Sequence, residues 1–127
     1  MLFFLLCGFT CLTSVSVVNA QEIFTSQNRY SAGGYPQSVA IGDFDGYGWK
    51  DLAAANWSRV SVRPGNGDGS FGPQTRYAVC NGPLTIAIGD FDGNGRQDLA
   101  VANFISDDVS VLLGNGDGSF ATQIRYP

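Results

Sequence analysis

An internal repeat constrains the fold of this chain more than any other feature of its sequence. The segment SVAIGDFDGYGWKDLAAAN at residues 38–56 returns as TIAIGDFDGNGRQDLAVAN at residues 85–103, 47 positions later. The segment GNGDGSF occurs at residues 65–71 and again at 114–120, 49 positions later. The two-residue difference indicates an insertion in a surface loop near residues 106–108. A period of about 40–50 residues with several short strands per unit is typical of propeller blades.

Each repeat unit has the pattern of four short strands. Alternating and β-branched residues favour strands over helices, and the runs between turn signals are too short for helices. The sequence therefore predicts an all-β chain with about two four-stranded blades of a β-propeller. Because a propeller typically needs about four to eight blades, we expect an incomplete ring. The first expected strand of each unit contains Val39 and Ile41, or Ile86 and Ile88. The second spans 51–57 or 98–104, the third spans 60–63 or 109–113, and the fourth spans 71–79 in the first unit.

The part of the chain before the repeats has its own signals. Residues 2–12 are largely apolar, and Val18-Asn19-Ala20 offers small residues where a signal peptidase reads, so we expect a secreted protein. The alternative, an uncleaved membrane anchor, is disfavoured because polar residues from Thr13 onward interrupt the apolar run. The expected division is a signal peptide at 1–20, a partial outer strand and linker of a preceding or permuted blade at 21–37, repeat 1 at 38–84 and a truncated repeat 2 at 85–127.

Each repeat also contains a nine-residue loop that is rich in oxygen ligands. In the loop at 90–98, alternate residues can converge on one cation, glycines permit the tight wrap, and a hard cation such as Ca²⁺ prefers six to eight oxygens. Val101 stands where an EF-hand would have its Glu, so the loop is not an EF-hand. The expected ligands are Asp90, Asp92, Asn94, the backbone carbonyl of Arg96, and Asp98.

The first copy of this loop differs at its fifth position. Tyr47 stands where the second loop has Asn94, and a phenol on a rigid ring is a poor substitute for an amide oxygen. We therefore expect a weaker calcium site. The alternative is that both loops are acidic turns without metal, in which three aspartates would repel one another. The expected ligands here are Asp43, Asp45, Tyr47, the backbone carbonyl of Trp49, and Asp51.

The motifs DFDGNGRQDL and VSVLLGNGDGSF resemble the FG-GAP/VCBS repeat family over nearly all of the chain from Phe24 onward. Related repeats form the propeller of integrin α-subunits. The resemblance implies a propeller with calcium loops, and Tyr47 departs from the family pattern. The residues that the resemblance implies as calcium ligands are Asp43, Asp45, Asp51, Asp90, Asp92, Asn94 and Asp98.

Composition excludes several other classes of function. The net charge is −4 with no basic patch, so we expect neither a nucleic-acid nor a membrane partner. There is no His, which removes the commonest acid/base catalyst and zinc ligand. The paired aspartates recur in phase with metal-ligand spacing, and no nucleophile-elbow motif is present, so we expect no enzyme activity. Cys80 is the lone cysteine outside the N-terminal segment and is expected to be an inert thiol or an intermolecular one.

The sequence thus predicts a secreted calcium-binding module for extracellular protein or carbohydrate binding or adhesion. We expect an extracellular protein or glycan ligand, and further propeller repeats in cis or by self-association. The alternatives are a propeller accessory region of a larger secreted enzyme and a purely structural repeat array. GNGDGSF is expected to be a hairpin turn rather than a second calcium element. Aromatic residues either pack between blades or form a sugar-stacking surface: Tyr47, Trp49, Trp57 and Phe104.

Overall fold

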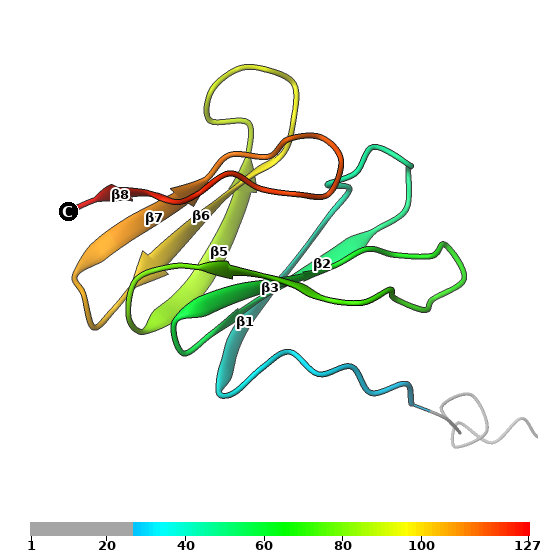
Figure 1. Cartoon of the computed structure of the whole chain (residues 1–127), viewed down its shortest axis with the longest axis horizontal. Helices are drawn as coiled ribbons and strands as arrows, with labels where there is room; N and C mark the ends of the chain where they lie inside the picture. The colour runs from blue at the N-terminus through cyan, green and yellow to red at the C-terminus, as the bar shows by residue number, and fades with distance from the viewer. Residues whose placement is uncertain (1–26) are drawn as a thin grey trace, which may run out of the picture.

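The computed structural model describes residues 27–127, which form two antiparallel four-stranded sheets and no helix (Figure 1). The strand orders are β1-β2-β3-β4 and β5-β6-β7-β8. This arrangement confirms the predicted all-β fold with two blades of a β-propeller-like structure, open rather than closed. The strands are β1 (Pro36–Gly42), β2 (Asp51–Asn56), β3 (Arg59–Arg63), β4 (Thr75–Ala78), β5 (Pro83–Gly89), β6 (Asp98–Asn103), β7 (Asp108–Leu112) and β8 (Ile124–Tyr126).

The predicted signal peptide at residues 1–20 lies outside the described residues. Among residues 27–127, no helix could cross a membrane.

The two sheets are built on the same register. Both first strands pair with their second strands through an irregularity after the opening proline, Pro36 or Pro83. The prediction for the fourth strand was too long: β4 covers only Thr75–Ala78, and Phe71 forms an isolated bridge with Gly65. Gly72 and Pro73 separate the two pieces. Proline has no backbone N–H to give to a ladder, so the strand starts after it.

The core lies between the two sheets, where β5 packs against β1 and β2. From the first sheet it takes small and β-branched side chains, among which Ala53, Ala55 and Val60 are fully buried. From the second sheet it takes larger ones, among which Leu99 and Val101 are fully buried. Alanines on the inner strand therefore let the second blade approach closely, as close packing of an interior requires.

Equivalent residues of the two blades differ in burial because each blade has one covered face. Phe44 is 3% exposed and packs edge-to-face on Phe120, with ring centroids 5.4 Å apart. Phe91 occupies the same place in the second repeat and is 51% exposed. Phe91 stands between two aspartates that point toward the cation site, a pattern that predicts a side chain turned away from the ion and into the core; this prediction is wrong for the described residues. The aromatic partner of this position comes from the following blade, and no blade follows the second one in the structure.

This difference gives a matched test of the packing between blades. Replacing Phe44 with Ala is expected to cost about 3–5 kcal/mol of unfolding free energy, because it leaves a cavity against Phe120. Replacing Phe91 with Ala is expected to cost less than about 1 kcal/mol in the monomer, since half of its ring is already in water. Urea unfolding of dilute chain, followed by tryptophan fluorescence, measures both. Equal losses for the two variants would contradict the observed packing.

Candidate metal centres

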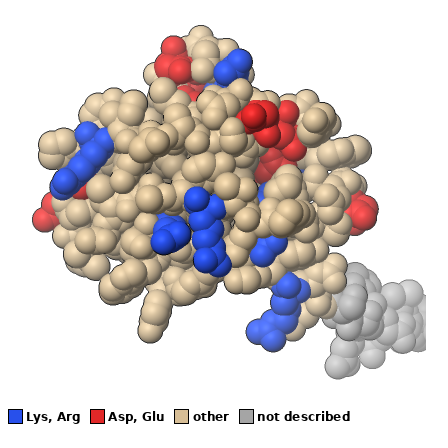
Figure 2. Space-filling model, viewed as in Figure 1, with Lys and Arg blue, Asp and Glu red and all other residues tan. Residues whose placement is uncertain are grey.

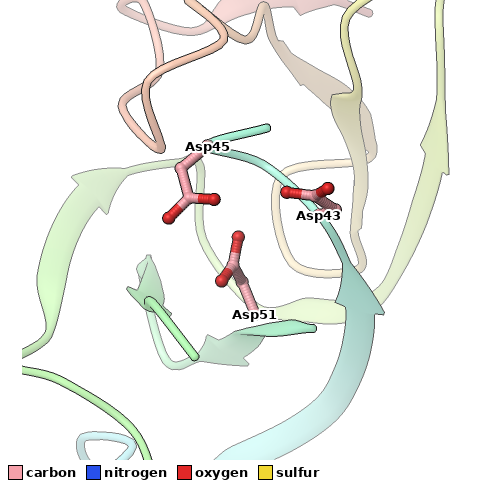
Figure 3. A group of neighbouring side chains, drawn as sticks. All are labelled: Asp43, Asp45 and Asp51. Carbon is pink, nitrogen blue, oxygen red and sulfur yellow. The ribbon is translucent and has the colours of Figure 1, made fainter. Parts of the chain in front are cut away.

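Three aspartates converge in the loop between β1 and β2 (Figure 3). One carboxylate oxygen from each of Asp43, Asp45 and Asp51 lies within 4.8 Å of the others. Asp90, Asp92 and Asp98 form the same group in the loop between β5 and β6. The structure therefore brings together all six aspartates that the sequence selected, three in each blade.

The ninth residue of each loop is buried and holds two segments together. Asp51 accepts hydrogen bonds from the backbone N–H groups of Phe44, at 2.7 Å, and of Gly65, at 2.8 Å. Asp98 accepts the equivalent bonds from Phe91 and Gly114, at 2.7 and 2.8 Å. Each oxygen of an ionised carboxylate has a second lone pair, so this bonding leaves capacity for a cation.

The first residue of each loop is oriented by backbone amides. Asp43 accepts bonds from the N–H groups of Gly46 and Gly48, at 2.8 and 2.9 Å. Both glycines have positive φ, 79° and 87°, which confirms that the wrap uses conformations that glycine adopts freely. In the second loop, the N–H of Gly95 bonds to Asp90 and lowers the pKa of its carboxyl below 3.8. The lowered pKa favours the ionised form of Asp90, which is the form that binds a metal.

The fifth positions differ as their residue types suggest. The amide nitrogen of Asn94 donates to Asp92 at 2.9 Å, and its oxygen accepts from the N–H of Arg96 at 2.8 Å, so this side chain lies on its acidic cluster. Tyr47 is 78% exposed. The ring of Trp49 lies over Gly67, where an added Cβ would stand 2.6 Å from a ring carbon. The backbone carbonyls of Trp49 and Arg96 stay predicted ligands.

Neither acidic cluster is neutralised by a basic side chain in the described part of the chain. Among residues 27–127, the only ion pair joins Arg125 to Asp108. Figure 2 shows acidic side chains gathered at the edge that carries the β1–β2 and β5–β6 loops. Three converging carboxylates without a counterion repel one another, and a small hard cation removes this repulsion. The donor set, which is all oxygen, fits calcium and not a soft metal.

The first loop also contacts the second blade. The N–H of Asp43 donates to the side-chain oxygen of Gln97 at 2.9 Å, and the N–H of Gly118 donates to the carbonyl of Phe44 at 2.9 Å. Reading each loop by itself missed these contacts. The repeat gave no signal for them, because each GNGDGSF segment follows the acidic loop of its own blade, whereas the contact of Gly118 with Phe44 joins two blades.

The other motifs have clear positions. Asp68 accepts bonds from the N–H and hydroxyl of Ser70, as expected of a turn, and Asp117 does the same with Ser119. Neither joins an acidic cluster in residues 27–127. Cys80 is a free thiol. The four aromatics singled out in the sequence are exposed, so the expectation that they pack between blades is wrong: Tyr47, Trp49, Trp57 and Phe104.

The close approach of Gly114 to the second loop allows a direct test. An added Cβ at Gly114 would collide with the carbonyl oxygen of Gln97. Gly114→Ala is therefore expected to lower the free energy of unfolding by about 1–3 kcal/mol, the usual cost of overpacking. Gly34 has no atom within 4 Å of the added Cβ, so Gly34→Ala is the control and should leave stability unchanged. A loss at Gly34 as large as at Gly114 would refute the steric explanation.

Comparison with known proteins locates the repeat. Residues 43–101 match the family model of the FG-GAP-like repeat, from the first acidic loop through the second. Neither the curated proteins nor the solved structures gave a match to the chain. The match at residues 43–101, together with the two antiparallel four-stranded sheets, supports an FG-GAP-like repeat within a β-propeller-like module.

Proposed function

We propose that the chain is a secreted, calcium-binding repeat module that binds extracellular protein or carbohydrate. The observation that carries the proposal is the convergence of three carboxylates within 4.8 Å, found twice and in phase with the repeat. Extracellular calcium is typically millimolar, and modules of this kind bind with dissociation constants of about 10⁻⁴–10⁻³ M. The apolar N-terminal segment supports secretion. Bound calcium holds the β1–β2 and β5–β6 loops in one conformation.

A ligand surface is supported at the opposite ends of the strands from the acidic loops. Trp57 and Phe104 stand at the β2–β3 and β6–β7 turns, and with Tyr35 they line a hollow of about 190 Å³. The rings of Tyr35 and Trp57 lie 5.8 Å apart. Exposed aromatic rings with a nearby amide, here Gln37, are suited to stacking on sugar rings or on apolar protein side chains. A purely structural array gives no reason to expose these rings.

Calcium titration by calorimetry tests the metal part of the proposal. We expect two binding events, the stronger at the second loop. Asp92→Asn should remove the stronger event and Asp45→Asn the weaker, because these outer aspartates can be changed without removing the buried bonds of Asp51 or Asp98. Tyr47→Asn should strengthen the first site, since it restores an amide oxygen at position 5. Asp107→Asn is the control, because Asp107 is an acid outside both clusters.

The outcome that contradicts the metal part is also defined. Absence of binding heat, together with a melting temperature unchanged by calcium, would reduce both loops to acidic turns. Binding that persists at full strength in the double variant Asp45→Asn and Asp92→Asn would place the metal elsewhere.

A printed oligosaccharide array and a panel of immobilised extracellular matrix proteins, both probed in excess calcium, test the ligand part. Trp57→Ala with Phe104→Ala should lower binding at least about tenfold, since stacked aromatic anchors dominate such sites. Trp49→Ala is the control, because Trp49 lies at the other end of the strands beside Gly67. If the control weakens binding as much as the double variant, the hollow is not the binding surface.

A further inference from the structure

The molecule exposes two apolar sheet faces. Each is equivalent, by the repeat, to one side of the packed contact between its own two blades. The upstream face is the open side of the first sheet, with Val39 and Ile41 at 59% and 61% exposure. Their equivalents in the second sheet are Ile86, at 9%, and Ile88, and these are covered by the first blade. The upstream face therefore has the side chains that, one repeat later, pack against a preceding blade.

The downstream face is the open side of the second sheet and has the complementary half. Val109 and Phe91 are exposed there, while their equivalents Val60 and Phe44 are buried against the second blade. Ala53 and Ala55 of the internal interface also recur, as Ala100 and Ala102. Inside this chain, the downstream face of the first sheet packs on the upstream face of the second sheet.

A four-residue motif, Gln-x-Arg-Tyr, marks the outer strand of each blade. It overlaps β4 at residues 74–77 and β8 at residues 123–126, and it occurs a third time at residues 27–30, ahead of the first blade. Residues 27–30 form no strand in this structure, and their side chains, up to Arg29, are exposed. The chain therefore has two sheets and three copies of the outer-strand motif.

The third copy lies where the outer strand of a preceding blade would lie. Tyr30 packs edge-to-face on Phe71 with ring centroids 5.4 Å apart, and Tyr77 of β4 packs on Phe120 in the same way at 5.5 Å. Arg63 donates to the carbonyl of Ser31 at 2.9 Å. The side chains of Asn56 and Ser61 donate to the carbonyl of Ala32. The segment is anchored to its own first blade while its other edge has no strand beside it.

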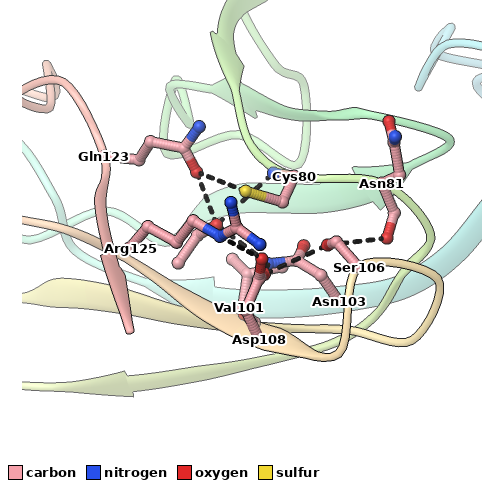
Figure 4. A network of polar contacts seen from close by, with 9 residues as sticks. Cys80, Asn81, Val101, Asn103, Ser106, Asp108, Gln123 and Arg125 are labelled. Atoms are coloured by element: carbon pink, nitrogen blue, oxygen red, sulfur yellow. Dashed lines mark hydrogen bonds and ion pairs between the residues drawn. The ribbon is translucent and has the colours of Figure 1, made fainter. Parts of the chain in front are cut away.

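The edge of β7 is the place that such a segment fits. β8 covers it with three residues, all exposed, through the Arg125–Asp108 ion pair and through Gln123, which accepts a hydrogen bond from Ser110 (Figure 4). Gln27 and Arg29 are the residues of the N-terminal motif that correspond to Gln123 and Arg125. They have the donor and acceptor groups that Asp108 and Ser110 already bind.

We propose that copies of this chain assemble head-to-tail, with the upstream face of one copy on the downstream face of the next. In this assembly, residues 27–30 of the first copy replace β8 of the second copy along β7. β8 is the strand that yields, because it is short and exposed, whereas residues 30–32 are tied to the first blade by Arg63, Asn56 and Ser61. Both open apolar faces become buried.

The proposal concerns assembly and does not depend on calcium or on a ligand. A head-to-tail contact continues from copy to copy until the ring closes. Because each chain supplies two blades and propellers have about four to eight, closure takes about two to four copies. The internal interface specifies an equivalent blade as the occupant, and a second copy of this chain supplies one.

Sedimentation velocity of the purified full chain and its variants, in excess calcium and again in chelator, tests the proposal. We expect a concentration-dependent species of about two to four copies. Val39→Asp with Ile41→Asp should abolish it, because charge enters the upstream face, while each monomer loses no buried contact. Ile105→Asp, at an exposed residue of the β6–β7 turn, is the control and should leave it unchanged.

Removal of residues 123–127 tests the strand replacement separately. Without β8 the edge of β7 is free, so association should strengthen by about tenfold or more through loss of the competing strand. Circular dichroism verifies that the shortened chain is folded. Three results would overturn the proposal: a monomer in both the full and the shortened chain, assembly that survives the Val39 and Ile41 changes, or a folded shortened chain that no longer assembles.

Discussion

The carboxylate at the ninth position of each acidic loop holds a blade together. Asp51 and Asp98 lie inside the protein, and each accepts one hydrogen bond from its own loop and one from the GNGDGSF segment about fifteen residues later in the chain. A buried carboxylate is stable only when it is bonded in this way. These two bonds fix the loop ends, and the two outer aspartates then converge on the same point. The geometry of each acidic cluster follows from a bond that involves no metal.

The same carboxylates connect the loops to the contact between blades. The GNGDGSF segment that Asp98 anchors also brings Phe120 against Phe44 and the N–H of Gly118 to the carbonyl of Phe44. An acidic loop is therefore in contact with the anchored segment of the following blade. The family match likewise begins at the first acidic loop and runs through the second.

Most of the fold could be predicted from the sequence because each element is set by local patterns that occur twice. The strand pattern, the turns and the six aspartates were all read from spacing, and the structure places them as expected. The errors concern residues whose surroundings come from another blade. Phe91 has the motif of a core residue but lacks its partner, and the aromatics at the turns are exposed because they lie beyond the ends of the strands. Periodicity within a repeat does not contain this information.

The packing of one blade on the next has a thermodynamic consequence. Since each blade packs only on its neighbours through equivalent residues, the stability of such a protein is a sum of blade terms and nearest-neighbour terms, as in a one-dimensional lattice. A blade at an end has one such term and an inner blade has two. Local unfolding should therefore begin at the short, exposed strand β8, while the contact of β5 with β1 and β2 opens last.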